Sequence, residues 1–129
     1  MREVRTHRQF RIDLEDGCYV AVVVAKTEKT MRRIECRVPG KFGMNKKQRN
    51  KKYIARTIQW FRGKELARVF FCKKWVGSGT VTHEMYHVAH HAAKRLRLSE
   101  EDAALLIERL VKVFWIEWRR EKFANKVYA

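Results

Sequence analysis

His83 and His87 are the residues whose type and spacing most directly predict chemistry. They enclose Glu84 in the segment Val81-Thr-His-Glu-Met-Tyr-His87. Residues four apart lie on one face of a helix, so both imidazoles could bind a single ion at the ~2.0–2.1 Å of zinc–nitrogen bonds. Glu84 lies about 100° around the helix, where it could take a proton from a water on the metal without being a ligand. The motif therefore predicts a Zn²⁺ site with Glu84 as the general base.

A catalytic zinc site needs a third protein ligand, with the fourth position left to water. His91 is eight residues beyond His83, about 12 Å along a helix axis, so we expect it to be exposed or to contact the next helix. If that helix runs back antiparallel after a turn near residue 98, Glu108 is level with His87. Glu101 is the alternative if the first helix ends early. We favour Glu108 on this geometry.

The histidines require a helix, which the sequence predicts over residues 80–96, with Ser78 or Thr80 as its cap. Ser99-Glu-Glu-Asp102 then has the form of a second helix start, with acids in the first turn to suit the helix dipole. Apolar residues recur at helical spacing beyond it. We therefore expect a second helix over residues 100–123, which forms a hairpin with the first.

The earlier part of the chain predicts strands. Phe10–Leu14 alternates apolar and polar residues, and Cys18–Ala25 is nearly all apolar, which together indicate a hairpin with a central second strand. A short helix should run from Thr27 to Arg33. Tyr53–Phe61 suits a helix or a strand. We favour a strand because a turn and a good strand, Leu66–Cys72, follow it.

These elements together predict an α+β fold. A small, mainly antiparallel sheet over residues 8–73 comes first, and the helical hairpin comes second. The length of 129 residues suits one domain over residues 1–129. Trp115 and Trp118 are expected at the core and rim of the hairpin.

The charge is the second strong signal. Thirty Lys and Arg against 14 Asp and Glu leave a formal net charge of +16, which attracts polyanions. The segment of residues 41–52 is the densest basic run and predicts an exposed loop. Contacts with nucleic acid or an acidic partner are expected from five of its residues: Lys46, Lys47, Arg49, Lys51 and Lys52.

Other classes of protein are disfavoured. The sequence has no apolar stretch of the roughly 18 residues that a membrane span needs, and its first residues lack the apolar core of a secretion signal. The cysteines Cys18, Cys36 and Cys72 have no paired spacing, which favours a reducing cytoplasm over a disulfide framework. We therefore expect a cytoplasmic protein.

The histidine motif, followed by a Glu on the next helix, resembles the gluzincin branch of the zincin metallopeptidases. That resemblance implies peptide hydrolysis with zinc as cofactor. It also implies an edge strand just before the metal helix, on which substrate lies as an added strand, and Leu66–Cys72 is in that place. Residues 66–115 are also similar to short phage and prophage proteins of unassigned role. In that pattern the Glu of the second helix falls at Glu100 or Glu101, and Glu108 takes the place of a small residue.

Two functions are therefore open. The first is a small zinc-dependent peptidase, phage-encoded, that acts in the host cytoplasm. The alternative is a non-catalytic basic binding module, such as a phage accessory or anti-defence factor that acts on a nucleic-acid-handling complex and keeps a structural or vestigial zinc. Three protein ligands and a water favour the enzyme, whereas four protein ligands favour a structural site.

Overall fold

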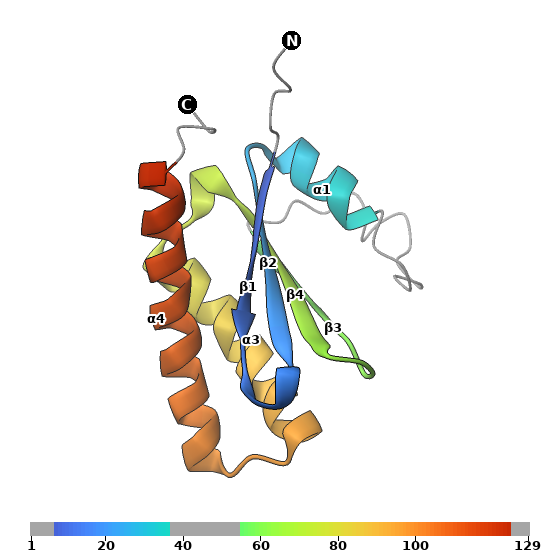
Figure 1. Ribbon diagram of the computed structural model, residues 1–129. Coiled ribbons are helices and arrows are strands. Elements are labelled where there is room, and N and C mark those ends of the chain that lie inside the picture. Colours follow the sequence, from blue (N-terminus) through green and yellow to red (C-terminus); the bar gives the residue numbers. More distant parts are fainter. Residues whose placement is uncertain (1–6, 37–54, 125–129) are drawn as a thin grey trace.

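The computed structural model describes residues 7–36 and 55–124, which form an α+β fold (Figure 1). The basic segment of residues 41–52 lies outside the described residues, and with it the predicted contacts of Lys46, Lys47, Arg49, Lys51 and Lys52. The main elements are β1 (His7–Asp13), β2 (Tyr19–Ala25), α1 (Glu28–Cys36), β3 (Ala55–Gln59), β4 (Glu65–Cys72), α3 (Ser78–Leu96) and α4 (Glu100–Ala124).

The four strands form one mixed sheet in the order β1-β2-β4-β3. The pairs β1–β2 and β3–β4 are antiparallel, whereas β2 and β4, the two central strands, are parallel. The sheet is thus mainly antiparallel, as expected. The central strands are apolar on both faces, because each face is covered by helix over part of its area.

One strand assignment was wrong. Leu66–Cys72 was expected at the edge of the sheet beside the metal helix, but β4 lies between β2 and β3. Its nearly continuous apolar sequence suits a central position. The edge strand beside α3 is β3, whose residues Arg56, Thr57 and Gln59 are polar and none of whose residues is fully buried.

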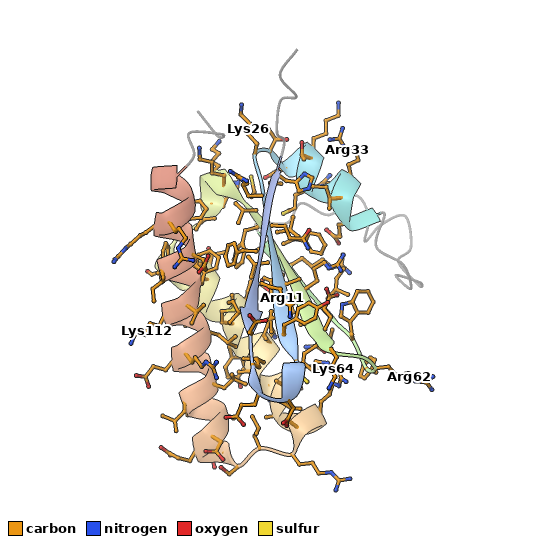
Figure 2. All side chains as sticks on the ribbon, in the orientation of Figure 1. Arg11, Lys26, Arg33, Arg62, Lys64 and Lys112 are labelled. Carbon is orange, nitrogen blue, oxygen red and sulfur yellow. The ribbon has the colours of Figure 1, made fainter. Side chains whose placement is uncertain are left out.

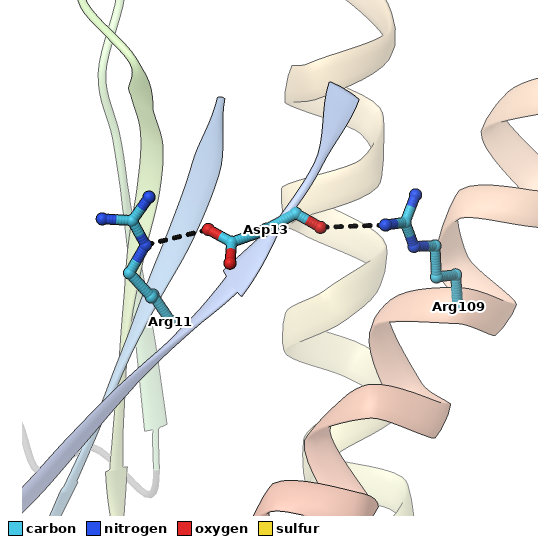
Figure 3. A network of polar contacts seen from close by, with 3 residues as sticks. All are labelled: Arg11, Asp13 and Arg109. Atoms are coloured by element: carbon cyan, nitrogen blue, oxygen red, sulfur yellow. Dashed lines mark hydrogen bonds and ion pairs between the residues drawn. The ribbon is translucent and has the colours of Figure 1, made fainter. Parts of the chain in front are cut away.

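The hairpin of α3 and α4 covers one face of the sheet, and α1 covers part of the other (Figure 1). Helix α4 packs near β1, where the rings of Phe10 and Phe114 lie 5.8 Å apart. Arg109 Nη2 also donates a 3.0 Å hydrogen bond to the Asp13 carbonyl oxygen, and the Asp13 carboxylate accepts one from Arg11 (Figure 3). Helix α3 packs against β3 and β4 instead.

The large core lies between the sheet and the α3–α4 hairpin. Alternate residues of the central strands meet apolar residues of both helices there. Trp115 and Trp118, expected at the core and rim of the hairpin, are both partly buried against this core. A smaller core lies under α1, where Met31 is fully buried. Cys18 and Cys72 are buried free thiols. No helix of the described ranges has the length and apolar character to cross a membrane.

The helix starts follow local capping chemistry in two of three cases. Thr27 Oγ1 accepts a 3.2 Å hydrogen bond from the Thr30 amide at the start of α1, which runs three residues longer than expected. Ser99 Oγ accepts one of 3.1 Å from the Asp102 amide at the start of α4. The expected cap of α3 was wrong, because its N-cap is Gly77, without a side-chain hydrogen bond.

Candidate metal centre

Helix α3 has one buried face and one exposed face. Its apolar residues, such as Val81, Met85 and Val88, are buried against the sheet and α4. His83 and His87 both lie on the exposed side. The helix therefore fixes the backbone of both histidines through its core packing and leaves their rings accessible to solvent.

The two imidazoles converge. His83 Nε2 and His87 Nε2 lie 3.2 Å apart, and the ring planes are nearly perpendicular, at 86°. Two nitrogens that each lie ~2.0–2.1 Å from one tetrahedral ion are separated by about 3.3–3.4 Å. The separation of the two nitrogens is thus close to that of two ligands of one zinc ion, and without the ion it matches a hydrogen bond between the two rings.

Glu84 does not share the exposure of its neighbours. Its side chain is 7% exposed and accepts a 2.5 Å hydrogen bond at Oε2 from the Thr57 hydroxyl of β3. Glu84 and His87 line the same pocket of about 360 Å³, together with Ala55, Arg56, Thr57 and Gln59. The carboxylate expected to act as a base and one of the expected ligands therefore border a common space at the sheet edge.

A stripe of polar side chains on α3 binds the far end of β3 and the turn after it. His91 Nε2 lies 2.6 Å from the Trp60 carbonyl oxygen, which also accepts a 3.1 Å hydrogen bond from Arg95. Arg95 donates a second one, of 2.9 Å, to Gly63. These residues follow Glu84 at seven and eleven positions, and so lie on the same side of the helix.

His91 was therefore placed wrongly at the sequence level. It is 4% exposed and its Nε2 contacts the end of β3, so the expected exposure to solvent was wrong. Because a carbonyl oxygen only accepts, Nε2 of His91 must carry the proton. The ring of Phe61 packs edge-on against it, 5.4 Å between centroids. His91 is thus a structural contact between α3 and the edge strand.

The two candidates for the third ligand lie elsewhere. Glu108 and Glu101 are exposed on α4. The side of α3 that shares a core with α4 carries Met85 and Ala89, about 200° around the helix from His87. Among the described residues, no group of three or more His, Cys, Asp or Glu is arranged to hold a metal ion. The structure brings His83 and His87 together, but neither glutamate joins them.

Thr57 and Gln59 are site residues that the sequence interpretation missed. Gln59 Nε2 donates a 3.4 Å hydrogen bond to the carbonyl oxygen of His87. Residues two apart on a strand point to the same face, so both reach α3 from β3. The sequence does show polar residues on either side of Ile58. They could be recognised as site residues only once β3 was known to border α3.

Comparison with known proteins gives no further assignment. The chain matches no protein-family model, no curated protein and no solved structure. The resemblance to gluzincins consequently stays a prediction that is carried by His83, Glu84 and His87.

Proposed function

We propose that the protein is a zinc-dependent peptidase in which His83 and His87 hold the ion and Glu84 is the general base. The observation that carries this proposal is the convergence of the two Nε2 atoms to 3.2 Å beside a pocket that Glu84 also lines. Zinc, when bound, supplies a Lewis acid that activates water and polarises the carbonyl under attack. The proposal leaves the third protein ligand unassigned, because Glu108 and Glu101, the candidates from sequence, do not lie beside the histidine pair among the described residues.

The chain itself supplies an oriented base. Thr57 donates to one carboxylate oxygen of Glu84 and so fixes the plane of the group. We assign proton transfer to the other oxygen, Oε1, which takes a proton from the attacking water and passes it to the leaving amine. Burial of Glu84 in the seam between α3 and β3 limits its contact with bulk water.

Strand β3 supplies the place for substrate. One of its edges pairs with β4, and none of the described strands pairs with the other. A peptide in extended conformation could add to that edge through backbone hydrogen bonds, a common mode of peptide recognition. We therefore propose β3, and not Leu66–Cys72, as the edge strand on which the substrate lies.

We also propose that the reaction takes place in the cytoplasm of a phage host.

The second candidate function is the basic binding module with a structural zinc. It is favoured by the net charge of +16, which peptide hydrolysis does not require. The two differ in what Glu84 does, because a structural site has no use for a base.

The deciding experiment is a peptide-library assay on zinc-loaded protein. A proteome-derived peptide mixture is incubated with wild type and with Glu84→Gln, and new termini are identified by mass spectrometry. The proposal expects cleavages that occur with wild type and disappear with the variant. Zinc-loaded wild type that gives no cleavage beyond the Glu84→Gln background would favour the binding module.

A further inference from the structure

One end of the sheet collects chain segments that are distant in sequence. Because β2 and β4 are parallel, they end side by side, with Ala25 paired to Cys72. The chain leaves β2 through Lys26 into α1, and leaves β4 through the short helical turn Lys73–Trp75. Both segments therefore emerge at the same end of the sheet (Figure 1).

Both segments expose cations. In α1 and the two residues before it, the exposed charged side chains are Lys26, Lys29 and Arg33. In the turn after β4, the exposed charged side chain is Lys74. Figure 2 shows Lys26 and Arg33 reaching outward at this end. Of the two acidic residues of α1, Glu35 is buried and paired with Arg56 at 2.7 Å, so the partly exposed Glu28 is the one that can offset these cations.

An aromatic ring lies beside one of these charges, in the turn after β4. Trp75 is 42% exposed, and Lys74 Nζ lies 5.1 Å from the centroid of its ring. An exposed indole beside ammonium groups is suited to stack on an unpaired base while the cations contact phosphates. We call the group of Lys26, Lys29, Arg33, Lys74 and Trp75 the basic end.

We propose that the basic end binds single-stranded nucleic acid, with the cations on the phosphates and a base stacked on Trp75. This ligand is chosen because an exposed ring flanked by cations matches the stacking and phosphate contacts of single-strand binding, and the test below separates it from an anionic membrane or an acidic protein. The proposal does not rest on the peptidase function, since it uses none of the residues of the histidine site.

The test measures the binding of a fluorescently labelled oligothymidylate by anisotropy over a range of salt concentrations. The triple variant Lys26→Gln, Lys29→Gln, Arg33→Gln is compared with a control triple of equal charge loss, Arg62→Gln, Lys94→Gln, Lys112→Gln. The latter residues are exposed elsewhere on the molecule. We expect the first triple to bind at least tenfold more weakly and its salt slope to fall by about two, at ~0.7 per lost contact. The control should change little.

Trp75 is tested separately. Trp75→Ala should weaken binding about 5- to 100-fold, whereas Trp75→Phe, which keeps a ring, should retain most of it. Phe61→Ala, at an 80% exposed aromatic outside the basic end, is the matched control. Thermal melting verifies that each variant is folded.

Three results would overturn the proposal. Equal losses in both triples would show that only the overall charge attracts the strand. Equal affinity for polyglutamate, or for vesicles of anionic lipid, would make the basic end a general anion surface. Unchanged affinity in folded Trp75→Ala would remove the stacked base.

Discussion

The hydroxyl of Thr57 donates a 2.5 Å hydrogen bond to the carboxylate of Glu84, and this bond joins the edge strand to the helix of the histidine pair. The accepting group is nearly buried. A hydrogen bond to a buried charge is stronger than one between neutral groups, and losing the donor leaves the charge without that partner. Thr57 is thus expected to affect both stability and chemistry.

Replacing Thr57 by Val should destabilise the fold by about 1–3 kcal/mol, because the methyl group cannot donate to Glu84. Thr57→Ser retains the hydroxyl and should lose less. Denaturant unfolding measures both. In the peptidase assay, Thr57→Val should lower kcat more than it raises KM, with zinc content unchanged. Equal stability of Thr57→Val and Thr57→Ser would show that the hydroxyl is not a significant partner of the carboxylate.

His83→Ala should abolish the binding of about one zinc ion per chain. The variant keeps only the imidazole of His87, and the pair of nitrogens 3.2 Å apart that would hold the ion is lost. Elemental analysis of protein purified without chelators gives the metal content. His90→Ala is the matched control, since His90 is exposed on the same helix and stacks on Tyr86. Zinc that persists in His83→Ala would refute the site.

Glu84→Gln and His87→Ala should separate the base from the ligand. Gln keeps the shape of Glu and can still accept from Thr57, so zinc content and melting temperature should stay close to wild type. Hydrolysis should nevertheless fall about 10²–10⁴-fold, the contribution typical of a positioned base. His87→Ala should lose zinc, activity and some stability, because bound metal contributes folding free energy. A Glu84→Gln protein with full biological activity would instead indicate a structural zinc.

Zinc affinity should fall as the pH drops, because protons compete with the ion for both imidazoles. With two histidine ligands, the logarithm of the association constant should change by up to about two per pH unit at the acidic limit. Competition with a chromophoric chelator, corrected for its own protonation, measures this slope. A pH-independent affinity would mean that groups other than His83 and His87 hold the metal.

The sequence predicted the helices of the hairpin closely because their signals are local. The Ser99 cap, the acidic first turn and the apolar spacing all lie within a few residues of the boundaries they define. The central position of β2 was also evident from its apolar run. The convergence of His83 and His87 followed from helix geometry alone.

The arrangement of distant elements could not be predicted in the same way. Whether Leu66–Cys72 is central or at the edge depends on its parallel pairing with β2, for which the sequence has no local signal. The position of Glu108 along the axis of the hairpin was predicted from the helix lengths. The direction in which its side chain points was not, because it depends on how α4 packs toward β1. The burial of His91 likewise depends on where β3 ends.

The parallel pairing of β2 with β4 has a consequence for how the chain folds. The β1–β2 hairpin is complete early in the sequence, but its central strand gains its second neighbour only when β4 arrives, much later in the chain. Val20, Val22 and Val24 of this strand meet α3 and α4 later still. Pairings so distant in sequence slow folding, because a large loop must close before they form. During synthesis on the ribosome, the exposed apolar face of β2 should therefore be the segment most dependent on chaperones.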